Sequence, residues 1–196
     1  MRSDADLEVR CLAAMSLLYS GNTSDEVVDL LTSRLTDTSE STRLQYAGLL
    51  AAVCPETSET LLPVLLELLT SESDEIRRNS ASSLGQLESR ATTAVPDLLM
   101  ALEDNTQSVR AAAVTALGRI EEPADQIVPA LIRELQLPRS TLLLRRRIIS
   151  TFEEMGPTAA PASSLVETFV GDPDLDIFAR RALASIRGEP VPDWDL

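Results

Sequence analysis

Arginine is the only strongly basic residue in this 196-residue chain, because all 17 of its Lys and Arg residues are arginine and histidine is absent. Without histidine there is no Ser-His-Asp triad and no His-Glu-x-x-His zinc motif, and without lysine there is no phosphate-binding P-loop. The guanidinium group instead forms paired hydrogen bonds with carboxylates and phosphates. We therefore predict no catalytic residue, no metal site and no cofactor, and a protein that is not an enzyme.

Five of the arginines recur at separations of 33, 34, 33 and 35 residues. They form what we call the arginine column: Arg10, Arg43, Arg77, Arg110 and Arg145. Counted from the residue before each arginine, apolar positions at plus five and plus eight form one stripe of a helix. The plus-eight positions are Leu17, Leu50, Leu84, Leu117 and Phe152, and a sixth copy begins at Phe178. The pattern predicts one amphipathic helix, the B helix, in each of six repeats.

A second periodic segment lies between successive B helices and predicts a second helix, the A helix. Prolines recur in it at Pro63, Pro96 and Pro129, and we expect them in the first helical turn, where the missing N–H costs no hydrogen bond. The expected A helices span 24–36, 57–70, 94–103, 124–136 and 160–170. The expected B helices span 7–19, 40–53, 74–87, 106–120, 140–155 and 173–187.

Stacking must complete the fold, because a single A–B hairpin cannot bury its own apolar stripe. We predict an all-α fold, a right-handed α-solenoid of about five and a half hairpins over residues 1–187. Residues 188–196 form a tail that covers the last repeat as a cap or, alternatively, acts as a docking peptide. The first repeat lacks an A helix. Its apolar edge either continues into a longer natural protein or contacts a partner or a second copy.

In the fourth repeat, residues 95–104 read VPDLLMALED and residues 109–120 read VRAAAVTALGRI. These segments resemble a HEAT repeat of the phycobilisome-lyase-like class, and the third repeat matches through Ile76-Arg77 and Leu84-Gly85. The resemblance covers roughly residues 5–187 and implies the solenoid. It also implies that the arginine column pairs with turn carboxylates, for which Asp37, Asp74 and Asp104 are suitably placed. Because this repeat occurs in scaffolds, adaptors, lyases and a few enzymes, the resemblance leaves the activity open.

The B helices are expected to line the concave face of the solenoid and to present partner-binding residues there. Toward the N-terminus these residues are apolar: Leu12, Met15, Tyr19 and Leu44. Toward the C-terminus they are basic: Arg78, Arg119, Arg146, Arg147, Arg180 and Arg181. The opposing interpretation is that these arginines only make the surface soluble and form ion pairs with carboxylates, namely Glu153, Glu154, Asp174 or Asp176.

The charge distribution indicates what kind of partner this face would bind. The net charge is −14, yet residues 138–187 carry 7 arginines against 6 acids. A local basic patch on an acidic body favours an acidic peptide or a small phosphorylated ligand over long nucleic acid. We predict a non-catalytic scaffold or adaptor that binds a peptide or protein partner. The resemblance permits a lyase-like helper for bilin-type attachment as the alternative, and net charge disfavours a nucleic-acid-binding HEAT protein of the alkyl-base glycosylase type.

The sequence also bears on the compartment. No apolar run approaches the ~18 residues of a membrane span, and the acidic N-terminus lacks the apolar segment of a signal peptide. Two cysteines, Cys11 and Cys54, are too few for a disulfide framework, and we expect both to be reduced. We therefore predict a cytoplasmic protein without a membrane partner.

Overall fold

The computed structural model describes residues 4–21 and 23–191, and the regular elements within these ranges are all helices. The B helices are α1 (Asp4–Tyr19), α3 (Glu40–Val53), α5 (Asp74–Gln86), α7 (Gln107–Ile120), α9 (Leu142–Met155) and α11 (Asp176–Ile186). The A helices are α2 (Asp25–Thr32), α4 (Ser58–Leu68), α6 (Val95–Ala101), α8 (Ala124–Gln136) and α10 (Ser163–Glu167). Every expected helix is present. Of the expected tail, residues 192–196 lie outside the described residues.

Short 3-10 turns shorten several A helices relative to the expectation. One of them, η1 (Ser33–Thr36), extends α2, and the others, η2 (Pro55–Thr57), η3 (Glu88–Ala94) and η4 (Gly156–Ala162), lead into α4, α6 and α10. Pro96 lies in the first turn of α6 as expected.

Two of the three prolines do not open their helices. Pro63 and Pro129 lie inside α4 and α8, so the expectation that they occupy the first turn is wrong. An interior proline leaves the carbonyl four residues earlier without its helical partner. Here those carbonyls belong to Glu59 and Asp125. Both of these residues and both prolines are exposed, so water can hydrate the carbonyls.

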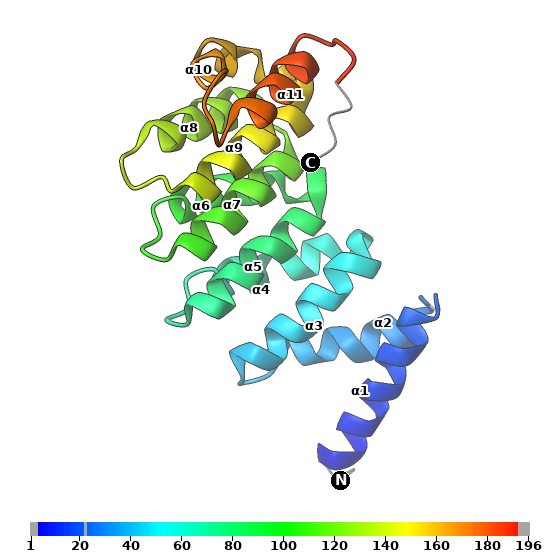
Figure 1. Cartoon of the computed structure of the whole chain (residues 1–196). Coiled ribbons are helices and arrows are strands. Elements are labelled where there is room, and N and C mark those ends of the chain that lie inside the picture. The colour runs from blue at the N-terminus through cyan, green and yellow to red at the C-terminus, as the bar shows by residue number, and fades with distance from the viewer. Residues whose placement is uncertain (1–3, 22, 192–196) are drawn as a thin grey trace.

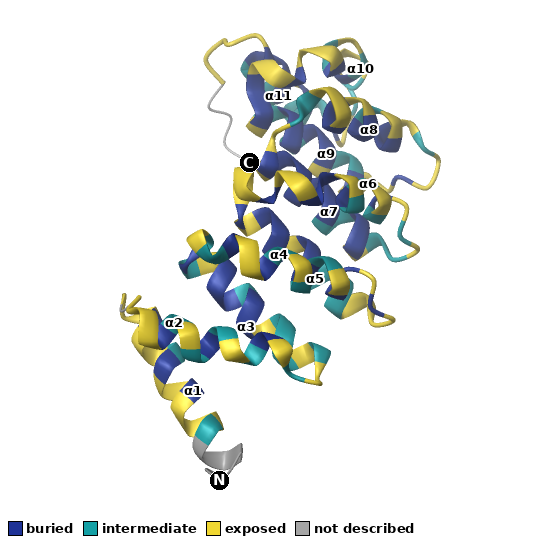
Figure 2. Cartoon of the chain, turned by 180° about the vertical axis from the view of Figure 1, so that it is seen from behind, coloured by how far each residue is buried: buried dark blue, intermediate teal, exposed yellow. Residues whose placement is uncertain are grey.

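The helices stack as successive hairpins in two layers, and the chain forms an all-α solenoid (Figure 1). From α3 to α11, successive B helices pack directly against one another, and more extensively than successive A helices do. The buried apolar residues of both layers form one cluster that extends along the array, visible as a dark band in Figure 2. Leu50, Leu84, Leu117 and Phe152 in this band are fully buried, as the repeat predicts.

The glycines of two B helices explain the close approach within that layer. A Cβ atom on Gly85 of α5 would lie 2.8 Å from the Cα atom of Ala116 on α7. A Cβ atom on Gly118 of α7 would overlap the Cγ2 methyl of Thr151 on α9. Neighbouring B helices therefore contact each other at distances that only glycine permits.

The first helix departs from the predicted register. It buries Cys11, Ala14 and Leu18, whereas Leu17 is 45% exposed and Val9 is 65% exposed. The prediction that Leu17 belongs to the buried stripe is therefore wrong. Within the described residues α1 contacts α2, and no preceding hairpin covers its other side, so its buried face is turned by one residue toward that neighbour.

Candidate functional site

Arg77 of the arginine column connects its own repeat to the next. Its Nε and Nη2 atoms donate to the two carboxylate oxygens of Asp104 at 2.7 and 3.1 Å. Its Nη1 atom donates to the carbonyl oxygens of Ser71 and Glu72 in its own turn, at 2.8 and 3.0 Å. The hydrogen bonds from Arg77 lower the pKa of Asp104, and Asp104 in turn raises the pKa of Arg77. The carboxylate is therefore held in its charged form at neutral pH.

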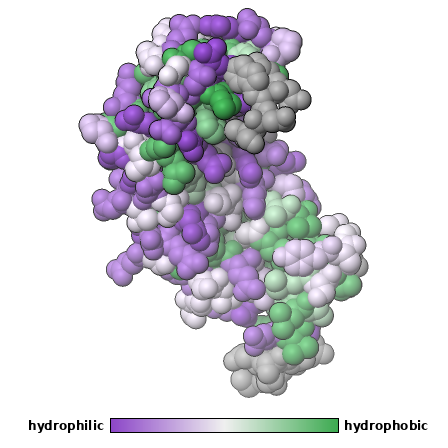
Figure 3. Space-filling view, in the orientation of Figure 1, coloured by the Kyte–Doolittle hydropathy of each residue, from purple (hydrophilic) through white to green (hydrophobic). Residues whose placement is uncertain are grey.

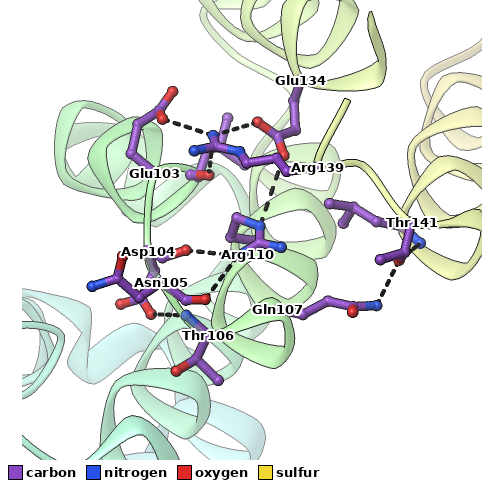
Figure 4. Close-up of polar contacts among 11 residues, drawn as sticks. Glu103, Asp104, Asn105, Thr106, Gln107, Arg110, Glu134, Arg139 and Thr141 are labelled. Carbon is purple, nitrogen blue, oxygen red and sulfur yellow. Dashed lines mark hydrogen bonds and ion pairs between the residues drawn. The ribbon is translucent and has the colours of Figure 1, made fainter. Parts of the chain in front are cut away.

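Arg110 repeats this arrangement one repeat later. Its Nη1 atom donates to the carbonyl oxygens of Asp104 and Asn105, at 2.8 and 3.1 Å. Its Nε atom lies 3.8 Å from the Oε1 atom of Glu134, at the end of α8. Figure 4 shows how these groups converge between α7 and α8.

Glu134 is a buried carboxylate with an arginine on either side. It is 2% exposed, and its Oε2 atom accepts a hydrogen bond of 2.8 Å from Nη2 of Arg139. The same nitrogen donates to Glu103 at 2.7 Å and to the Leu102 carbonyl at 3.2 Å (Figure 4). These bonds raise the pKa of Arg139. Charge-assisted hydrogen bonds therefore join the turns that follow α6 and α8 in the middle of the array.

The other members of the column differ from the expectation. Arg43 pairs with Glu67 at 2.9 Å, whereas Asp37 pairs with Arg34 at 2.8 Å. Arg10 is exposed, and neither it nor Arg145 forms an ion pair within the described residues.

The geometry around Arg145 shows why the last full repeat differs. Glu167 lies near the end of its A helix, as Glu67 does in the third repeat, but it pairs with Arg187 instead of Arg145. The Nε atom of Arg145 is buried and makes no hydrogen bond. Among the described residues, therefore, the column connects successive repeats only through Arg43, Arg77 and Arg110.

The B helices also line a groove, and its N-terminal part is an apolar pocket of about 600 Å³. We define this apolar pocket by its main lining residues: Met15, Tyr19, Leu44, Leu49, Val53, Asn79 and Ser83. Three of the four expected apolar residues thus lie together, on α1 and α3. Leu12 is exposed on α1, one turn before Met15, and does not line the pocket.

The middle of the groove is an arginine pocket of about 310 Å³ between α5, α7 and α9. Arg78, Arg119 and Arg147 line it, one from each helix, around a surface of small residues that includes Gly85 and Ala112. Arg119 and Arg147 are exposed and form no ion pair with the described residues. Arg78 is 43% exposed at its side chain and, among the described residues, forms one ion pair, with Glu75 at 3.8 Å. We call the charge of Arg119 and Arg147 uncompensated in this sense, although Arg119 also lines a neighbouring pocket with Glu88, Glu121 and Glu154.

The three expected arginines nearest the C-terminus are paired instead. Arg180 forms an ion pair with Asp176 at 2.8 Å, and Arg181 donates to Oε1 of Glu153 at 3.0 and 2.9 Å. In this part of the chain, therefore, the arginines form surface ion pairs, as the opposing interpretation of the sequence expects.

Arg146 is held in the same way, by Asp174 and by an aromatic ring. It lies 3.7 Å from the Asp174 carboxylate and 5.3 Å from the centroid of the Phe178 ring. With Arg146, Arg180 and Arg181 paired, the uncompensated charge lies in the middle of the groove and not at its C-terminal end.

A third pocket of about 790 Å³ joins the other two along the C-terminal ends of α5, α7 and α9. It shares Ala52 with the apolar pocket, and Gln86 and Arg119 with the arginine pocket. We call the three pockets together the B-layer groove. In Figure 3 the hydrophobic surface gathers over the N-terminal helices, and hydrophilic surface predominates over the later repeats.

The sequence analysis considered Glu154 only as an ion-pair partner of the arginines and gave no role to Glu88 or Glu121, whereas all three acids line this third pocket. Glu88 and Glu121 have φ angles of 51° and 63°, a region that residues other than glycine rarely adopt. The signal available in the sequence was an acid beside a helix C-terminus, where the helix dipole disfavours it.

The described residues contain no group of three or more His, Cys, Asp or Glu side chains that could hold a metal ion. In the part of the chain that the structure describes, no helix is both long and apolar enough to cross a membrane.

Comparison with known proteins agrees with this architecture. A family model of HEAT repeats matches residues 1–85, 31–106 and 62–135, whereas no curated protein matches the chain. One engineered protein of known structure is 19% identical with a TM-score of 0.63, over 95% of this chain and 93% of that chain. A second is 20% identical with a TM-score of 0.63, over 96% and 56%. A designed armadillo repeat protein is 16% identical with a TM-score of 0.62, over 95% of each chain. At these identities the likeness shows the fold alone.

Proposed function

Because the chain belongs to the HEAT-repeat family, whose solenoids generally mediate protein interactions and are typically non-catalytic, we propose that it is a scaffold for an acidic peptide. The peptide is a segment of a partner protein, and it binds in the B-layer groove with its acidic side chains in the arginine pocket. The apolar pocket gives a neighbouring stretch of the same groove an affinity for uncharged side chains.

The observation that carries the proposal is the uncompensated charge of the arginine pocket. The chain has 31 acids for 17 arginines, so a carboxylate partner for every arginine is abundant. Such partners are present for Arg146, Arg180 and Arg181. Nevertheless, none of the described carboxylates forms an ion pair with Arg119 or Arg147. Like-charged guanidinium groups on one small surface repel each other, and an anionic ligand removes that repulsion.

The size and surroundings of the pocket favour a peptide over nucleic acid. A volume of about 310 Å³ accommodates one or two acidic side chains. Nucleic-acid affinity comes largely from neutralising many phosphates at once, and three arginines supply few such contacts. The net charge of −14 adds a repulsive field for a long polyanion, whereas a short peptide places its acids only next to the arginines.

The test compares two charge reversals of equal size on different layers. Arg147→Glu places a carboxylate in the arginine pocket, and Arg133→Glu makes the same change on exposed Arg133 of α8, which does not line the B-layer groove. A fluorescein-labelled peptide of alternating Glu and Ser is titrated at low salt and followed by anisotropy. Losing a charge-assisted hydrogen bond costs about 1.5–3 kcal/mol, so we expect Arg147→Glu to weaken binding at least tenfold.

Arg133→Glu should bind the peptide with unchanged affinity, and circular dichroism of both variants should match that of the parent protein. Equal affinities of the two variants would show that the arginine pocket does not bind the acidic peptide. Binding of a duplex DNA of similar charge with the same dependence on Arg147 would favour the nucleic-acid alternative instead.

A further inference from the structure

The B-layer groove joins two unlike pockets, and we infer that it recognises a two-part motif in one extended peptide. The motif consists of an apolar anchor in the apolar pocket and an acidic group in the arginine pocket, with about four or five residues between them. The inference rests on the proposed function, because it specifies the ligand of the same groove.

The apolar pocket has the composition of a site for an uncharged side chain. No Asp, Glu or Arg lines it. Tyr19 is 71% exposed at its edge, and Met15 and Leu44 are only partly buried. Leu12 and Val9 extend the exposed apolar surface of α1 beyond it. A contiguous exposed apolar patch rimmed by polar residues is typical of a binding site.

The two pockets lie on the same path across the B helices. The apolar pocket is centred on α3, which supplies most of its lining, and the arginine pocket is centred in the same way on α7. Helix α5 lies between them: Asn79 and Ser83 line the first pocket, and Arg78 lines the second. A ligand in one pocket therefore continues into the other without leaving the groove.

The helix packing gives the length of the connecting segment. Packed helices lie about 8–10 Å apart, so two steps from α3 to α7 span about 16–20 Å. An extended chain advances about 3.3–3.6 Å per residue, so the two anchors are about five or six residue steps apart, with about four or five residues between them. Gln45 and Gln86 are exposed along this path, and their side-chain amides can donate to and accept from the backbone of an extended peptide.

The test varies the spacing within synthetic peptides. Each fluorescein-labelled peptide carries one Phe, then one, five or twelve Gly/Ser residues, then two Glu residues, and a control peptide lacks the Phe. Anisotropy titrations should show the five-residue spacer binding at least tenfold tighter than the one-residue spacer, which cannot span both pockets. The twelve-residue spacer should fall between them, because a longer flexible linker lowers the effective concentration of the second part.

Two variants separate the parts of the motif. Tyr19→Asp changes a side chain that is largely exposed, so we expect folding to be preserved. In this variant the affinity for the five-residue-spacer peptide should fall to the affinity for the control peptide. Arg147→Glu should weaken every peptide, and Arg133→Glu none.

If all spacers bind equally, with the same dependence on Arg147, the two-part motif is wrong and the acidic-peptide function stands. If no peptide shows any dependence on Arg147, the proposed function fails, and the motif fails with it.

Discussion

The contact between Gly118 of α7 and Thr151 of α9 gives the sharpest test of the B-layer packing. In Gly118→Ala the added methyl would overlap the Cγ2 atom of Thr151, which is 1% exposed and has no space to move into. A β-branched side chain in a helix has one or two allowed rotamers, so Thr151 cannot turn away at little cost.

Two opposing effects set the magnitude. Alanine is favoured over glycine inside a helix by about 1 kcal/mol. Forcing an extra methyl into a filled core costs about 1–3 kcal/mol and occasionally more. The overlap with Thr151 places the cost in the upper part of this range, about 2–3 kcal/mol, so we expect Gly118→Ala to lower the free energy of unfolding by about 1–2 kcal/mol. For a chain of this length that corresponds to a Tm lower by about 2–8 °C in a thermal melt followed by circular dichroism.

The second substitution identifies the cause. Thr151→Ser removes the Cγ2 methyl and keeps the hydroxyl, so Gly118→Ala in this background should cost nothing or should stabilise the protein. Gly48→Ala in α3 is the matched control, because its Cβ would meet only the Oγ atom of Ser83, at 3.0 Å. If Gly118→Ala is equally destabilising with and without Thr151→Ser, the contact with Thr151 is not the cause and the reasoning is refuted.

Three further predictions follow from the polar contacts and the core. Glu134→Ala leaves Arg110, 8% exposed at its side chain, without its carboxylate, and we expect a loss of about 3–5 kcal/mol in urea denaturation. Arg77 lowers the pKa of Asp104, so the stabilisation is present above the unfolded-state pKa of about 3.9 and is lost as pH falls through the lower folded-state value. In thermal melts at decreasing pH, the Tm of the parent protein should therefore approach that of Asp104→Asn. Burial raises the pKa of the Cys54 thiol, and both cysteines are fully buried, so Ellman's reagent at pH 8 should label the protein only after denaturation.

The repeat architecture was predictable because periodicity is a property of the chain itself. An apolar stripe recurring six times predicts six B helices, and the structure contains them. The stripe in α1 was misplaced by one residue because the alignment followed Arg10, whereas burial follows the neighbouring helix.

The ion pairs were harder to predict because they depend on how one repeat is placed on the next. Asp104 was identified for Arg77 because it lies in a turn directly after an A helix. Glu67 and Glu134 were missed because they lie within or at the end of A helices, and only the stacking brings them to Arg43 and Arg110.

In the groove, too, the position of a residue on its helix was predictable, whereas its ion-pair partner was not. Of the predicted apolar residues, Met15, Tyr19 and Leu44 line one pocket. Of the six predicted arginines, three line another: Arg78, Arg119 and Arg147. The sequence analysis named Asp174 and Glu153 as possible partners, but not which arginine each would reach, because Arg146–Asp174 and Arg181–Glu153 each join residues 28 positions apart.

The hydrogen bonds of Arg77, Arg110 and Arg139 lie in the middle of the array, on the same repeats that carry the arginine pocket. Helix α1 contributes to the apolar pocket without any such connection among the described residues. We therefore expect the two halves of the groove to differ in preorganisation: the arginine pocket should be the more rigid one before binding, and the apolar pocket should lose more conformational entropy when its ligand binds. We expect amide exchange to be slow in α7 and fast in α1, and a ligand to engage its acidic end first.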